Sequence, residues 1–141
     1  MAVYDIPGFS WTLPADADFS GATTVKNRAV SVNSDGEAIL PAANYVKLIG
    51  VAQNKPVAGE GTTIVSSGIT IMNAAGVNDA STPASAAIAP GDYVTARASD
   101  GKAVKAVTTA SQVLGIVVKG SVSSGGTGDI SVLLFPTQNL V

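Results

Sequence analysis

The sequence contains no cysteine and no histidine, and only 13% of its 141 residues are charged. Without cysteine there is no disulfide framework, no thiol nucleophile and no thiolate metal site. Without histidine the chain lacks the usual general base, any Ser-His-Asp arrangement and the commonest zinc ligand. We therefore expect neither an enzyme nor a protein with a bound cofactor or metal.

Charge is scarce and dispersed. The formal net charge is −2, and the eight basic residues form no cluster that could neutralise phosphates, so nucleic-acid binding is not expected. No apolar run approaches the roughly 20 residues that span a bilayer, and the first residues do not read as a signal peptide. We expect synthesis in the cytoplasm and no membrane partner. A surface with so few charges repels other proteins only weakly, which suits permanent assembly.

The remaining polar residues form no recognisable catalytic pattern. No serine sits in a Gly-x-Ser-x-Gly elbow. Most of the acidic residues fall at turns, where an aspartate hydrogen-bonds its own backbone. The glycine-rich stretches lack the Lys-Ser/Thr of a phosphate loop, and Asp16-Ala17-Asp18 lacks the glycine and distant glutamate of a calcium loop.

A repeat organises most of the chain. Asp35-Gly36 recurs as Asp100-Gly101, and the strand-like segment around Gly50 recurs around Gly115, both 65 positions later. Asp-Gly between strands is typical of a hairpin with a type I′ turn. A glycine within a strand indicates a bulge, a barrel corner or a close backbone approach. We interpret Gly50 and Gly115 as a shared structural corner.

About nine short strands punctuated by glycine, proline or Asp-Gly predict an all-β fold, a small β-barrel or sandwich built from a duplicated hairpin unit. The expected organisation is an extended N-terminal arm over residues 1–24 and a β-domain over 25–141. Within that domain the copies cover about 25–72 and 91–135, and 73–90 is expected to be a linker.

The two copies are not expected to present equivalent surfaces. Val30 and Val32 precede the first turn, whereas the apolar residues before the second turn, Val94 and Ala96, align one position earlier. A shift of one residue moves a side chain to the opposite face of a strand. Either a bulge absorbs this shift or the two copies pack differently.

Four of the seven aromatic residues lie in the N-terminal arm. The alternation in Phe9-Ser10-Trp11-Thr12-Leu13 is typical of a half-buried strand. The arm either folds back onto its own barrel or lies on a partner, adding a strand or filling pockets. On the second alternative, the predicted contact residues are Tyr4, Ile6, Phe9, Trp11 and Leu13.

The order and spacing of short motifs resemble the bacteriophage capsid decoration, or cement, proteins across roughly residues 25–135. The motifs are Asp35-Gly36, Leu48-Ile49-Gly50-Val51, Gly91-Asp92-Tyr93-Val94, Asp100-Gly101-Lys102-Ala103 and Leu114-Gly115-Ile116. The resemblance implies a β-barrel protein on the outer surface of an expanded phage head. It implies the major capsid protein as partner, homotrimers at three-fold or quasi-three-fold positions, and clamping of capsomers against internal DNA pressure.

A different class of function is a head- or tail-attached module that recognises host carbohydrate. Sugar sites usually present exposed aromatic side chains flanked by polar groups. Outside the arm the aromatic residues are Tyr45, Tyr93 and Phe135, so these would carry such a site.

Overall fold

The computed structural model describes residues 6–45, 47–98, 100–108 and 111–135. These ranges contain eleven strands and no helix, which confirms the all-β prediction. The strands are β1 (Ile6–Pro7), β2 (Ser10–Pro14), β3 (Ala29–Val32), β4 (Ala38–Ile39), β5 (Gly50–Ala52), β6 (Gly61–Val65), β7 (Gly68–Asn78), β8 (Tyr93–Ala96), β9 (Ala103–Lys105), β10 (Gly115–Lys119) and β11 (Thr127–Leu134).

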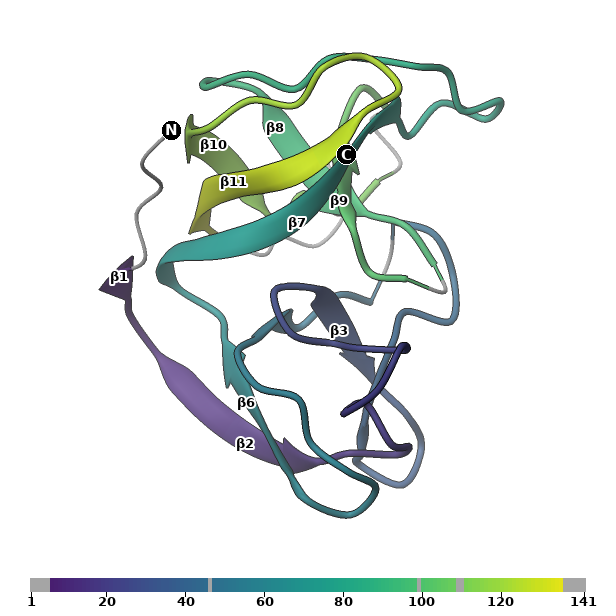
Figure 1. Ribbon diagram of the computed structural model, residues 1–141, viewed down its shortest axis with the longest axis vertical. Coiled ribbons are helices and arrows are strands. Elements are labelled where there is room, and N and C mark those ends of the chain that lie inside the picture. Colours follow the sequence, from purple (N-terminus) through teal and green to yellow (C-terminus); the bar gives the residue numbers. More distant parts are fainter. Residues whose placement is uncertain (1–5, 46, 99, 109–110, 136–141) are drawn as a thin grey trace.

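The strands form two closed sheets that lie one above the other (Figure 1). In the first barrel the order is β2-β6-β5-β3-β4, and a parallel bridge between Ala15 and Ala38 closes the ring. In the second barrel the order is β7-β11-β10-β8-β9, and parallel pairing of β9 with β7 closes it. The short β1 adds to the free side of β7.

The two barrels repeat one pairing scheme. The strands β3, β4, β5 and β6 correspond to β8, β9, β10 and β11, and this is the duplication seen in the sequence. Each barrel also begins with a strand that the sequence repeat does not reveal, β2 in the first and β7 in the second.

The predicted unit boundaries therefore need correction. Residues 69–72 were placed at the end of the first copy, but they belong to β7, which pairs with β11 of the second barrel. The expected linker at 73–90 begins inside this strand, which extends to Asn78 because the small residues after Asn73 pair with Thr127–Asp129.

The predicted type I′ turns are also wrong. Within each Asp-Gly pair only the glycine has a positive φ, 81° at Gly36 and 63° at Gly101. A type I′ turn requires positive φ at both central residues. The first hairpin instead uses a five-residue loop, in which the Asn33 side chain accepts hydrogen bonds from the backbone N–H groups of Asp35 and Glu37.

Gly50 and Gly115 occupy the same structural position. A Cβ on Gly50 would collide with the carbonyl oxygen of Val65, and one on Gly115 would collide with that of Leu133. The carbonyls belong to the equivalent strands β6 and β11. Each glycine thus allows a neighbouring backbone to approach closely.

A change of register accounts for the shifted apolar face. Gly50 pairs with Val30, whereas Gly115 pairs with Val94, the residue that aligns with Ala29. The same one-residue shift separates the β3–β4 pairing from the β8–β9 pairing. In the second copy β8 is therefore displaced by one residue relative to both β9 and β10. This displacement keeps Val94 and Ala96 inside the barrel.

The core has two parts. The smaller cluster fills the first barrel and includes Phe19, Val30 and Ile64, with Trp11 and Leu13 packed against it. The larger cluster fills the second barrel and extends into the junction between the barrels. The arm thus folds back onto its own barrel: β2 pairs along its whole length with β6.

Candidate interaction surface

Large apolar side chains are exposed on the outer face of the second barrel. Tyr93 is 50% exposed, Leu133 39% and Phe135 38%. They come from β8, from β11 and from the residue that follows β11. Tyr93 is far from Leu133 and Phe135 in the sequence, so the fold brings it beside them.

Strand register aligns these residues into a continuous row. Tyr93 pairs with Ile116, Ile116 with Leu133, and Leu133 with Ile69. Directly opposed residues of neighbouring strands point to the same face of a sheet. Tyr93, Ile116, Leu133 and Ile69, here called the apolar row, therefore cross β8, β10, β11 and β7. In register, Ile69 pairs with Ile6 of β1, the next position of the row.

The aromatic end of the row is held in place. The rings of Tyr93 and Phe135 meet edge to face, with centroids 6.3 Å apart and planes at 83°. The backbone N–H of Phe135 donates to the carbonyl of Leu114 at 2.8 Å. Beside Tyr93, Asp92 forms an ion pair with Lys105 at 3.0 Å, which neutralises the charges nearest this end. The row thus offers an ordered aromatic anchor in a neutral setting, a feature typical of binding hot spots.

The first barrel has an equivalent row, and it is buried. Ala29 pairs with Val51, and Val51 with Val65, as Tyr93, Ile116 and Leu133 pair in the second barrel. Ala29, Val51 and Val65 are at most 1% exposed and belong to the larger core cluster, not to the cluster inside their own barrel. The outward row of the first barrel is thus covered by the second barrel, while the outward row of the second barrel faces solvent.

The structure separates the contact residues predicted from the arm. Trp11 and Leu13 pack against the core of the first barrel, and the Trp11 indole donates to Ser66 Oγ at 3.1 Å. Phe9 is 66% exposed, and Ile6 lies in β1 at the end of the apolar row. Tyr4 lies outside the described residues.

Sequence reasoning did not find Ile116, Leu133 or Ile69. Each lies in a strand where apolar residues are expected on the inner face, and only the pairing register shows that these three point outward together. Alternation within a single strand identifies two faces but does not say which face is inside.

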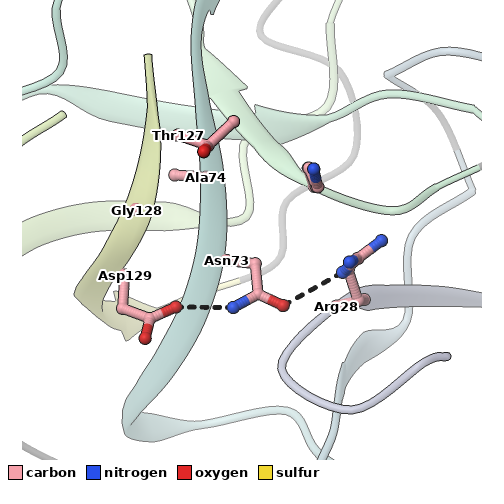
Figure 2. A pocket seen from close by; sticks show the side chains of 7 residues that line it. Arg28, Asn73, Ala74, Thr127, Gly128 and Asp129 are labelled. Carbon is pink, nitrogen blue, oxygen red and sulfur yellow. Dashed lines mark hydrogen bonds between the residues drawn. The ribbon is translucent and has the colours of Figure 1, made fainter. Parts of the chain in front are cut away.

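A polar hollow of about 260 Å³ lies where the barrels meet. Figure 2 shows Asn73 between Arg28 and Asp129. Arg28 Nε donates to Asn73 Oδ1 at 3.0 Å, and Asn73 Nδ2 donates to Asp129 Oδ1 at 2.5 Å. Arg28 also donates to the carbonyl of Asp100 at 2.9 Å. This network connects the first barrel to β7, to β11 and to the second Asp-Gly turn.

The second Asp-Gly turn contains a carboxyl group whose pKa is lowered. Burial disfavours the Asp100 carboxylate, but hydrogen bonds from the Arg97 guanidinium and the Lys102 N–H outweigh it and lower the pKa of Asp100. The Arg97 Nη2 to Asp100 Oδ2 distance is 2.6 Å. At the same turn Ala29 donates to the carbonyl of Gly101 at 2.9 Å, so the turn also joins the barrels.

Among the described residues, no group of three acidic side chains is placed to hold a metal ion. Those same residues contain no helix long and apolar enough to cross a membrane. The described residues form surfaces and hollows suited to binding, and the best defined of these is the apolar row.

Comparisons with known proteins bear on the fold. No protein-family model matches the chain, and no curated protein matches it in sequence. The head fibre gp8.5 N base of bacteriophage phi29 has a similar structure, with a TM-score of 0.58 and 19% sequence identity. The match covers 90% of this chain and 93% of that one. The chain therefore has the fold of a phage head fibre base over nearly its full length.

Proposed function

We propose that this chain is a structural protein of a bacteriophage virion that attaches to the head. The observation that carries the proposal is the apolar row, an exposed surface across β8, β10, β11 and β7 whose counterpart in the first barrel is buried against another barrel. The fold shared with a phage head fibre base supports the same function. The role is structural, not catalytic.

In finer terms, the partner of the row is the major capsid protein on the outer surface of the shell. The row supplies apolar area and a fixed aromatic pair, the features that dominate protein–protein affinity. A homotrimer that bridged neighbouring capsomers would gain further, because the second and third contacts become intramolecular once the first is made. Attachment at such junctions would cement the shell.

The test is co-sedimentation with expanded heads that lack the protein. Wild type should bind saturably and in a fixed ratio to the major capsid protein. The double variant Ile116→Thr, Leu133→Thr should bind about tenfold or more weakly, since each lost apolar anchor costs on the order of 1 kcal/mol or more. Threonine retains the preference for strand structure.

Val32→Thr is the matched control, because Val32 is also a strand residue, is 44% exposed, and lies in the first barrel away from the row. It should bind heads as wild type does. Equal binding by the double variant and wild type would remove the row from the interface. Failure of wild type to bind would overturn head attachment itself. Sedimentation equilibrium of the free protein tests the trimer separately.

A further inference from the structure

A second hollow, of about 370 Å³, opens at one end of the second barrel. Part of its wall is apolar and comes from Ala80, Pro83 and the ring of Tyr45. The rest is polar and uncharged apart from one carboxylate. The polar members are Asn44, Ser81, Thr108, Ser111 and Asp79. An apolar wall with a few polar groups is the usual composition of a small-molecule site.

Asp79 is the unusual member of this wall. It is only 2% exposed. Its Oδ1 accepts hydrogen bonds from the backbone N–H groups of Val107 and Thr108, at 2.6 and 3.0 Å. Its Oδ2 has no hydrogen-bond partner among the residues that the structure describes. A buried carboxylate oxygen without a donor costs free energy, so it favours any ligand that brings one.

In the described part of the chain two other buried side-chain oxygens lack partners, those of Thr62 and Thr95. Both belong to neutral hydroxyls, which lose less when they are unpaired than an ionised carboxylate does. Neither threonine lines the hollow. Asp79 is thus the one of the three that combines a charged group with a place in the wall of a hollow.

The backbone fixes Tyr45 at the edge of this hollow. Its φ is 65°, a left-handed conformation that is uncommon for a bulky residue. Its N–H donates to the carbonyl of Ala96 at 2.9 Å, and its carbonyl accepts from the N–H of Gln112 at 2.7 Å. Burial, followed by the negative charge of Asp79, raises the pKa of the Tyr45 hydroxyl. The phenol therefore stays neutral and remains a hydrogen-bond donor.

We propose that this hollow binds a neutral saccharide. A sugar ring would lie against Tyr45 and Pro83, and one of its hydroxyls would donate to Asp79 Oδ2. The side chains of Asn44 and Ser81, both exposed at the rim, would bond neighbouring hydroxyls. Oδ2 is covered in the free protein, so this hydrogen bond requires the wall to open. Among the described residues of the wall Asp79 is the only charged one, so the site would favour neutral sugars over anionic ones.

This proposal does not depend on head attachment. The hollow and the apolar row share no residue. A protein that binds saccharide without binding heads, or heads without saccharide, is therefore a possible experimental result, and each assignment can fail alone.

The experiment is a glycan array that carries neutral hexoses and N-acetylhexosamines together with sialylated and uronic-acid sugars, probed with the full chain. Wild type should bind neutral members and no anionic ones. Asp79→Asn should lose at least tenfold in binding, because its amide oxygen must face the two backbone donors and its NH2 group then replaces the free acceptor. Tyr45→Ala should lose a similar amount by removing the ring.

Tyr93→Ser is the control, since Tyr93 is an exposed tyrosine outside the hollow, and it should bind sugars as wild type does. Thermal melting confirms that each variant is folded, and if Asp79→Asn does not fold, Tyr45→Ala and Ser81→Ala decide in its place. Absence of neutral-sugar binding by wild type overturns the proposal. So does undiminished binding by the folded variants.

Discussion

The two barrels share a pairing scheme and a glycine corner but differ in what covers their outer faces. In the first barrel the outward row of Ala29, Val51 and Val65 is small, and it is buried in the junction. In the second barrel the corresponding residues are the larger Tyr93, Ile116 and Leu133; Tyr93 and Leu133 are exposed and Ile116 is half-buried. The two copies of the unit thus differ: the outward row of the first barrel is buried within the protein, and that of the second barrel is available to a partner.

Strand length contributes to this difference. The strands β7 and β11 have 11 and 8 residues, whereas their counterparts β2 and β6 have 5 each. In the longer pair, β7 also pairs with β1 at one end of the row, and β11 leads into Phe135 at the other. Four predictions test how far the equivalence of the barrels extends and where it ends.

The largest effect is expected at the shared corner. Gly50→Ala and Gly115→Ala each place a Cβ against a carbonyl oxygen of the neighbouring strand. We expect each to lower the free energy of unfolding by about 3 kcal/mol, since the backbone must move to relieve the clash. Urea denaturation measures this. If only one variant is destabilised, the corners are not equivalent.

The equivalent rows should respond differently to truncation. Val51→Ala removes buried methyl groups and should cost about 2 kcal/mol, whereas Ile116→Ala, in a half-buried position, should cost about 1 kcal/mol or less. Head binding should reverse the order: Ile116→Ala weakens it and Val51→Ala does not. Equal losses of stability would mean that the second row is covered within the free protein.

The sequence pattern predicted the strands of the second copy better than it predicted the first strand of each barrel. The Asp-Gly turns and the two glycines mark β3 to β6 and β8 to β11 because those positions have backbone requirements that few residues meet. The strands β2 and β7 share no such marker, since Ser10–Pro14 and Gly68–Asn78 have neither sequence pattern nor length in common. Closure of each barrel therefore could not be predicted.

The interaction surface was missed for a related reason. A long-range register decides that Ile69, Ile116 and Leu133 face outward, and this register depends on pairing between residues far apart in the sequence, such as Ile69 and Leu133. The arm, by contrast, was recognisable as a half-buried strand from Phe9 to Leu13, and β2 lies there. Composition alone could not show that Trp11 packs against the core of its own barrel.

The junction between the barrels should be sensitive to Asn73, which connects Arg28 to Asp129. Asn73→Ala leaves the half-buried Arg28 guanidinium with one partner fewer, and we expect a loss of about 1 to 2 kcal/mol in urea denaturation. Asn54→Ala is the control: it removes hydrogen bonds within the first barrel only and should not change contacts between the barrels. Protection of the Ala29 and Asn73 amides from hydrogen exchange, which report on the junction, should fall only in the Asn73 variant.

The smallest effect compares the two Asp-Gly turns. Asp100 holds Arg97 and has a lowered pKa, while no described side chain donates to the Asp35 carboxylate. Because the folded pKa of Asp100 lies below its unfolded value near 3.8, its contribution is fully present above about pH 5 and is lost as the pH falls through the folded pKa. Asp100→Asn should therefore cost about 1 kcal/mol at pH 7, and the difference from wild type should shrink below pH 4. Asp35→Asn should leave stability unchanged at pH 7. A pH-independent deficit in Asp100→Asn would assign the effect to turn geometry and not to charge.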